Sequence, residues 1–213
     1  DLTRILVEDA LSEMFLPADN IVRRLLSRME HIMQAHDISA TTMAALLAPW
    51  NIRPAVFREP DRLTDYLTGE ILAALADWFY LSPEWLNGRV HYPLYRPGDW
   101  PATQEIFCRI ISARENMDII LWHGFPFAGT HSGEYCGVLL RQKKEINNTI
   151  IYPVLSLYPV RMDIEKEGWF QMARKISPDI PVRAVTLTPA QAEYLITGKI
   201  LPTALFRVPL SPW

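Results

Sequence analysis

The chain of 213 residues has two cysteines, nine glycines and no long apolar run. Two cysteines, Cys108 and Cys136, exclude a disulfide scaffold and favour a reducing, cytoplasmic setting. The longest apolar runs, such as residues 150–157, fall far short of the roughly 20 residues of a membrane-spanning helix, so we expect no membrane partner. Acidic side chains near the N-terminus predict no signal peptide. No phosphate-binding loop or dinucleotide fingerprint is present.

The chain also has no excess of basic charge. Its formal net charge is −3: residues 1–20 have a net charge of −4, residues 21–98 are balanced, and the remainder has a net charge of +1. A strongly basic nucleic-acid-binding domain would carry more positive charge, so this charge balance argues against any DNA-binding hypothesis. A hydrophobic share of 49% excludes disorder as the main state.

The first half predicts a series of short helices. An amphipathic stripe predicts a helix over residues 3–16, and a cleaner stripe predicts a second helix from Ile21 that ends at His36. Ser39 is placed to cap a helix over Ala40–Leu47, because its hydroxyl can accept from free amide groups of the first turn.

Further start and stop residues divide the rest of this half. Asn51 predicts the cap of a short helix over Ile52–Arg58 that Pro60 stops, and Thr68 predicts the cap of the next helix. The pair Ser82–Pro83 is typical of a helix start, and Asn87–Gly88 of a left-handed stop. Three prolines and one glycine within Val90–Pro101 predict a domain boundary.

The second half mixes the periods of helices and strands. We expect three helices: over Thr103–Ala113, after Asp163, and from Thr188–Pro189 to Gly198. The second of them should bury Ile164, Met172, Ala173 and Ile176. We expect four strands, over Asp118–Trp122, Tyr135–Arg141, Ile150–Leu157 and Val182–Leu187. The polar residues 142–149 are expected to join two of these strands. The predicted fold class is α+β, with a small antiparallel sheet in the second half.

One constellation in the first half carries a family resemblance. The strongest part is Leu72-x-x-Leu75-Ala76-Asp77-Trp78-Phe79-x-x-Ser82-Pro83-Glu84-Trp85-Leu86-x-Gly88. Together with the Ser39-capped helix that contains Ala44, this run resembles the lambda-repressor-like, Xre-type helix-turn-helix domain of bacterial and phage regulators. The resemblance covers about a third of the chain.

The resemblance implies a DNA interface. Residues 52–58 would be the recognition helix in the major groove of duplex DNA. Arginine is the natural reader of guanine, and side chains at helix starts can contact phosphates. The implied DNA-binding residues are Ser39, Thr41, Asn51, Arg53, Pro54, Phe57 and Arg58, with Arg23, Arg24 and Arg28, expected on the exposed face of the preceding helix, as backbone contacts.

Two departures from the family pattern favour an alternative. The predicted recognition helix carries Pro54, Ala55, Val56 and Phe57 where the family usually has polar residues, and the carboxylates Glu59, Asp61 and Asp65 follow it. The alternative is a protein-interaction module, an adaptor or antirepressor, that keeps the fold without the DNA contacts.

A third hypothesis is an enzyme whose site lies in the segment from His123 to Cys136. His123, His131, Glu134 and Cys136 would suit zinc by type, but their spacing matches no zinc signature, and Cys136 reads as a buried strand residue rather than a nucleophile. We therefore expect no enzyme, no metal and no cofactor. Trp122, Phe125 and Phe127 flank the glycine-rich loop and are candidates to line a small effector pocket.

The sequence thus predicts a DNA-binding transcription regulator. The expected organisation is an N-terminal amphipathic helix (1–20), a helix-turn-helix domain (21–89), a linker (90–101) and an α+β sensor or dimerisation domain (102–213). A homodimer is expected because one short recognition helix contacts too few base pairs for useful specificity. A small-molecule effector is a further expected partner.

Overall fold

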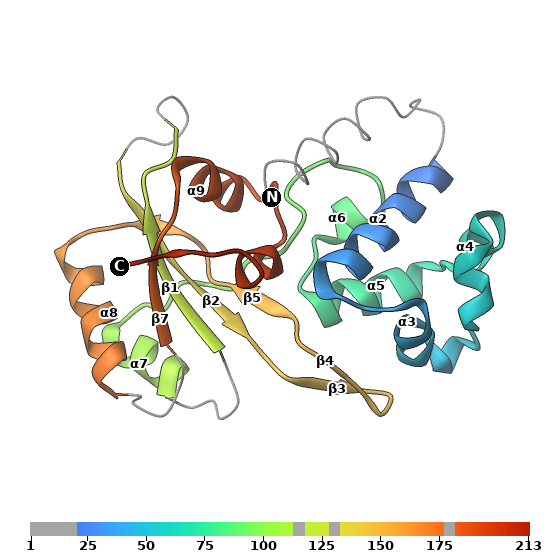
Figure 1. Ribbon diagram of the computed structural model, residues 1–213, viewed down its shortest axis with the longest axis horizontal. Helices are drawn as coiled ribbons and strands as arrows, with labels where there is room; N and C mark the ends of the chain where they lie inside the picture. The colour runs from blue at the N-terminus through green and yellow to red at the C-terminus, as the bar shows by residue number, and fades with distance from the viewer. Residues whose placement is uncertain (1–20, 113–117, 128–132, 177–181) are drawn as a thin grey trace. The chain divides into compact units, whose positions relative to one another are not determined.

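The computed structural model describes residues 21–112, 118–127, 133–176 and 182–213, so the helix predicted over residues 3–16 lies outside the described residues. The chain divides into two compact units (Figure 1). The helical unit comprises Asp1–Tyr95 and Lys144–Pro153, and the sheet unit comprises Arg96–Lys143 and Val154–Trp213. The α+β class is confirmed. Within the described residues, no helix has the length and apolarity to cross a membrane.

The helical unit is built from short helices, of which α3, α5 and α6 start at polar caps. They are α2 (Ile21–His36), α3 (Ala40–Leu46), α4 (Pro60–Tyr66), α5 (Gly69–Phe79) and α6 (Pro83–Leu86), with two 3-10 helices, η1 (Ala48–Trp50) and η2 (Pro54–Arg58), between α3 and α4. The predicted caps are confirmed: Ser39, Thr68 and Ser82 each accept a hydrogen bond from the backbone N–H three residues later. Gly88, at φ +84°, ends α6 as predicted.

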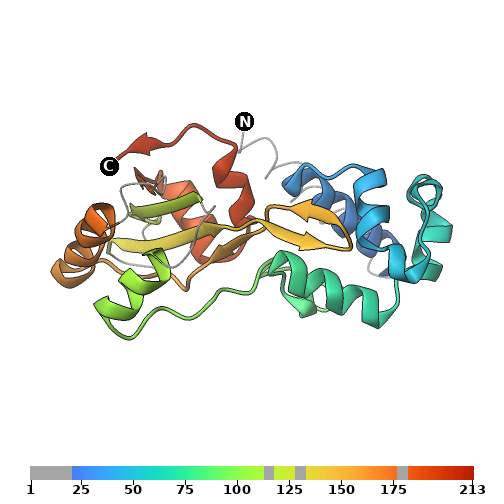
Figure 2. The same cartoon turned by 90° about the horizontal axis from the view of Figure 1, so that it is seen from below.

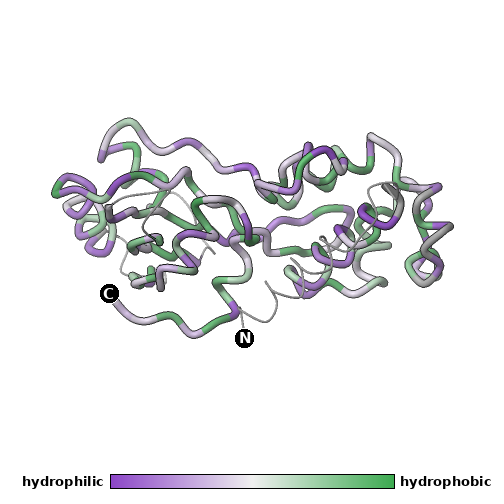
Figure 3. The backbone as a smooth tube through the Cα atoms, turned by 90° about the horizontal axis from the view of Figure 1, so that it is seen from above, coloured by the Kyte–Doolittle hydropathy of each residue, from purple (hydrophilic) through white to green (hydrophobic). Residues whose placement is uncertain are grey.

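The core of this unit is formed by apolar side chains at helical spacing. Members of each helix face are almost completely buried: Met29 and Ile32 from α2, Met43 and Leu46 from α3, Leu75 and Phe79 from α5, and Leu86 from α6. Hydrophobic and hydrophilic residues alternate along the helices (Figure 3), as expected for amphipathic helices that cover a core.

The predicted helix over Ile52–Arg58 is wrong in type and extent. Residues 54–58 form the 3-10 helix η2, and Arg53 before it is extended, with ψ 153°. The cause is Pro54, which lacks an N–H and pushes its predecessor out of the helical region. Asn51 does not cap this segment either, because it is left-handed (φ 54°) and ends η1. Pro60 begins α4 instead of stopping a helix.

The sheet unit contains a six-stranded mixed sheet. Its strands are β1 (Asp118–Gly124), β2 (Tyr135–Arg141), β5 (Val154–Ser156), β6 (Val160–Arg161), β7 (Val182–Thr186) and β8 (Ser211–Pro212), in the order β5-β2-β1-β7-β8 with β6 on β2. The expectation of a purely antiparallel sheet is wrong, because β7 pairs parallel to β1. A parallel pair needs a long crossover, and the chain between β1 and β7 includes α8 (Ile164–Ile176).

Helices cover both faces of the sheet. On one face, α8 and α7 (Gln104–Ser112) lie side by side and pack Phe107, Trp169 and Phe170 against the sheet (Figures 1 and 2). On the other face lies α9 (Pro189–Ile196), which begins at the predicted Thr188 cap and is followed by Gly198 at φ +68°. The 3-10 helix η3 (Pro202–Phe206) contacts β5.

The buried stripe of α8 differs from the prediction. Trp169, Phe170 and Ala173 are buried, whereas Ile164 is 90% exposed and Met172 is 42% exposed. At about 100° per residue, Ile164 lies on the side of the helix opposite the aromatic pair. The side chain of Ile176 lies outside the described residues.

The strand predicted over Ile150–Leu157 is two strands. Residues 149–151 form β4, which pairs with β3 (Lys144–Ile146), and residues 154–156 form β5, which pairs with β2. The β3–β4 hairpin belongs to the helical unit, so this unit is not one continuous stretch of chain. Its turn is Asn147–Asn148, both left-handed, which is the geometry of a two-residue hairpin turn.

Candidate nucleic-acid interface

The start of α3 presents the first of the predicted DNA-binding residues. Ser39 and Thr41 are both exposed. The Ser39 hydroxyl oxygen accepts from the Thr42 N–H at 3.1 Å and lies 2.9 Å from the Thr42 hydroxyl oxygen. The cap therefore fixes the start of α3 and leaves Thr41 at the surface.

The segment after α3 presents the second group. Asn51, Arg53 and Pro54 are exposed, and Phe57 is half-buried. Between them Ile52 and Val56 are buried, at 3% and 8% exposure. The side chain of Arg58 lies outside the described residues. The polar residues of this segment therefore face outward while its aliphatic residues anchor it to the core.

The three arginines predicted on α2 differ in how much of each side chain is exposed. Arg23 is exposed and Arg24 is half-buried. Arg28 is only 2% exposed, so the prediction that it lies on the outer face is wrong. Its Nη2 donates to the backbone oxygen of Val90 at 3.2 Å, and its guanidinium carbon lies 5.4 Å from the centre of the Trp85 ring. Arg28 thus connects α2 to α6 and to the segment that follows it.

The family-like run over α5 and α6 serves packing. Leu72, Leu75, Ala76 and Phe79 are buried along α5, and Trp85 and Leu86 are buried in α6. The Ser82 hydroxyl accepts from the Trp85 N–H at 3.2 Å. These residues therefore belong to the core of the helical unit.

The β3–β4 hairpin is a neighbour of this surface that the sequence analysis missed. The Asn147 side-chain amide donates to the backbone oxygen of Leu46 at 2.7 Å, at the end of α3. Lys144 Nζ donates to the backbone oxygens of Asp77 (3.3 Å) and Trp78 (3.4 Å) near the end of α5. The signal was present in the Asn147–Asn148 pair, which is typical of a hairpin turn.

Acidic residues lie close to the predicted DNA-binding segment in the sequence. Glu59 and Asp65 are exposed. Glu59 Oε2 pairs with Nη1 of Arg62 at 3.0 Å, with both side chains at least half exposed. An exposed pair of this kind contributes little to stability, and the remaining carboxylate charge opposes phosphate approach.

The residues predicted to line an effector pocket do not share one environment. Trp122 is completely buried and lies against Gly137 of β2, whereas Phe125 and Phe127 are 58% and 55% exposed. Trp122 is therefore a core residue, and the prediction that all three side chains line one pocket is wrong. The Trp122 ring needs the space of the missing side chain at Gly137, which the hydrophobic pattern alone does not reveal.

A polar cluster lies at one end of the sheet. His123 Nδ1 contacts the Glu134 carboxylate, and His123 Nε2 lies 2.9 Å from the Thr186 hydroxyl oxygen. Of the metal-ligand set considered in the sequence, His131 lies outside the described residues. Among the residues that the structure describes, no group of three or more His, Cys, Asp or Glu side chains is placed to hold a metal ion.

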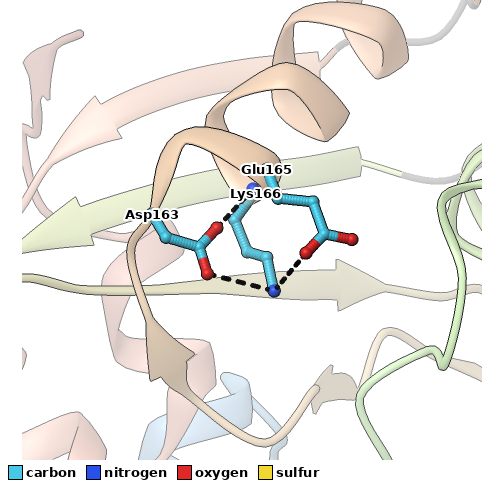
Figure 4. Close-up of polar contacts among 3 residues, drawn as sticks. All are labelled: Asp163, Glu165 and Lys166. Atoms are coloured by element: carbon cyan, nitrogen blue, oxygen red, sulfur yellow. Dashed lines mark hydrogen bonds and ion pairs between the residues drawn. The ribbon is translucent and has the colours of Figure 1, made fainter.

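Cys136 is next to this cluster, but its thiol is unreactive. It is completely buried, and burial, with further contributions from Asp163 and Glu134, raises the pKa of its thiol to about 12. Nearby, Lys166 Nζ bridges the carboxylates of Asp163 (3.2 Å) and Glu165 (3.3 Å) at the start of α8 (Figure 4). The thiol is thus protonated at neutral pH and is not a nucleophile.

The chain matches no protein-family model, and it matches neither a curated protein nor a solved structure. Any function must therefore be argued from its own residues and geometry.

Proposed function

We propose that the protein is a DNA-binding transcription regulator in which the helical unit contacts duplex DNA. The observation that carries this proposal is the sorting of side chains over residues 39–56. Ser39, Thr41, Asn51 and Arg53 are exposed, while the side chains of Met43, Leu47 and Ile52 between them are buried. This is the arrangement expected of a folded module that offers polar groups and a cation to a phosphate backbone.

The shape of η2 limits how such a module would read sequence. Five residues of 3-10 helix span about 10 Å at about 2 Å per residue, close to the width of one major groove. Among its described neighbours, Arg53 is the natural base or phosphate contact. We therefore expect affinity from phosphate contacts, weak specificity from one copy, and a homodimer that doubles the contacts. In this proposal the sheet unit serves as the sensor or dimerisation part.

The test is fluorescence-anisotropy titration of short duplex DNA at several salt concentrations. Each phosphate contact contributes about −0.9 to the slope of log affinity against log salt, so Arg23→Ala with Arg53→Ala should flatten the slope by about 2. Arg89→Ala is the matched control, because Arg89 is an exposed arginine of the same unit that is not one of the predicted DNA contacts. Equal slopes for wild type and the double variant would remove the proposed interface, and a wild type that fails to bind at low salt would remove the function.

A second candidate is the protein-interaction module, and one observation favours it. Small apolar side chains are exposed around the same segment: Ala45, Ala48, Pro49, Pro54 and Ala55. Exposed apolar residues near a protein's functional face are typical of protein contacts. Under this candidate, Ala48→Glu should abolish association with the partner and Arg53→Ala should leave it intact. Measuring association of both variants by surface plasmon resonance separates the two candidates.

A further inference from the structure

The cluster of His123, Glu134 and Thr186 lies where sheets with parallel strands commonly place a site. Thr186 is the last residue of β7, and His123 is directly opposite it, one residue before the end of the parallel strand β1. Glu134 immediately precedes β2, and its backbone oxygen accepts from the Met162 N–H at 2.9 Å. The carboxyl ends of parallel strands are the usual edge for ligand and catalytic groups. The cluster meets solvent, since 14% of the His123 side chain and 30% of the Glu134 side chain are exposed.

For a neutral His123 ring, the two contacts assign one tautomer. A carboxylate only accepts hydrogen bonds, so the contact with Glu134 requires a proton on Nδ1 of His123. In the neutral ring Nε2 is then an acceptor, and its partner at 2.9 Å is the Thr186 hydroxyl, which must donate. The result is a hydroxyl, an imidazole and a carboxylate joined in that order. The ring of Trp213 lies 4.3 Å from the imidazole centre and packs over it.

We propose that Thr186, His123 and Glu134 form a hydrolytic site for carboxylic esters with an apolar acyl group. Thr186 is the nucleophile, His123 the general base, and Glu134 the residue that orients the base. Phe125 directly follows β1 and Phe127 lies two residues further along, both exposed, and in this proposal they supply the apolar surface for the acyl group. This site is independent of the DNA interface, because its residues belong to the sheet unit.

The neighbouring nucleophile is excluded by its surroundings. Cys136 is opposite His123 in the β1–β2 ladder, but it is fully buried, and its thiol stays protonated. Thr186 is half-buried and is the hydroxyl within hydrogen-bond distance of the ring nitrogen that accepts. The attacking atom is therefore oxygen.

The proposed reaction proceeds in two steps. In the first, the hydroxyl proton of Thr186 moves to Nε2 of His123 as Oγ1 bonds to the ester carbonyl carbon, and the alcohol leaves with that proton as its bond to the carbon breaks. In the second, water gives a proton to Nε2 while its oxygen bonds to the acyl carbon, and the bond to Oγ1 breaks as the proton returns to Oγ1. The net reaction converts an ester and water into a carboxylic acid and an alcohol.

The experiment is hydrolysis of 4-nitrophenyl butyrate by the full chain, with mass spectrometry of the acylated protein. Wild type should carry a butyryl group on Thr186, Thr186→Ser should remain active, and Thr186→Val should lose both hydrolysis and the adduct. Thr149→Val, a threonine of the helical unit, is the matched control and should match wild type. Loss of the base in His123→Gln should reduce the rate by about 100-fold or more. Glu134→Gln should lower kcat with little change in KM, because Glu134 contacts the base and not the ester.

Two outcomes would overturn the proposal. One is hydrolysis by folded Thr186→Val at the wild-type rate. The other is wild-type protein without an adduct on Thr186 after quenching during turnover, and this second result holds even if a variant fails to fold.

Discussion

Replacing Gly137 should destabilise the sheet unit, because this glycine packs against the rigid ring of Trp122. It is directly opposite Trp122 in the β1–β2 ladder. A Cβ at this position would lie 2.7 Å from three atoms of the Trp122 ring, Cε2, Cζ2 and Nε1. Trp122 is completely buried, so the ring cannot swing into solvent to relieve the contact. Gly137→Ala should therefore lower the free energy of unfolding by about 1–3 kcal/mol, the usual cost of overpacking a core.

Gly168 supplies the matched control with the opposite sign. It lies within α8, and a Cβ there would meet no atom within 4 Å. Glycine inside a helix costs roughly 0.5–1 kcal/mol relative to alanine, so Gly168→Ala should stabilise the protein by about that amount. Equilibrium urea denaturation followed by circular dichroism measures both: the midpoint should fall for Gly137→Ala and rise for Gly168→Ala.

A double-mutant cycle tests whether the ring is the cause. Trp122→Leu removes the three ring atoms, so adding Gly137→Ala to that variant should cost much less than it costs in wild type. An equal cost in both backgrounds, or no cost in wild type, would refute the reasoning. The cycle distinguishes a clash with the ring from any intrinsic effect of alanine in β2.

Three further predictions concern a cap, a buried arginine and a buried thiol. Ser39→Ala removes the acceptor for the Thr42 N–H and should lower the free energy of unfolding by about 1 kcal/mol, measured by urea denaturation; an unchanged midpoint would show that the cap is not needed. Arg28→Ala removes a charged donor from the Val90 carbonyl and should cost about 1.5–3 kcal/mol in thermal unfolding, a loss that would be absent if Arg28 served only as a surface contact. For Cys136, the unfolded thiol ionises near pH 9 whereas the folded thiol stays protonated until about 12. Wild type should therefore lose stability relative to Cys136→Ala as pH rises above 9, by at most about 1.4 kcal/mol per pH unit, and parallel pH curves would contradict this.

Much of the helical unit could be predicted because its signals are local. Ser39, Thr68 and Ser82 each accept from the backbone of their own first turn, so sequence neighbours decide the outcome. The stripe over α5 is buried as its spacing indicates. The helix predicted over Ile52–Arg58 failed for a reason that is also local: Pro54 holds Arg53 extended, and the segment forms a 3-10 helix.

The misplaced residues depend on contacts between distant parts of the chain. The helical spacing predicts that Arg28 lies on the exposed face of α2, yet it is buried against Trp85 and the backbone oxygen of Val90. The parallel pairing of β1 with β7 brings His123 to Thr186, which are 63 residues apart. The sequence singled out His123, Glu134 and Cys136 but not Thr186, because periodicity does not reveal the register between two strands.

The β3–β4 hairpin has a consequence for how the chain is completed during synthesis. A ribosome releases α3 early, yet the backbone oxygen of Leu46 receives its donor from Asn147, which is made 101 residues later. The backbone oxygens of Asp77 and Trp78 in α5 likewise receive their donor only once Lys144 has been made. The helical unit therefore emerges first but finishes folding only after β1 and β2 of the other unit have been translated. A gene cut within residues 90–101 would separate the helices from the strands that complete them.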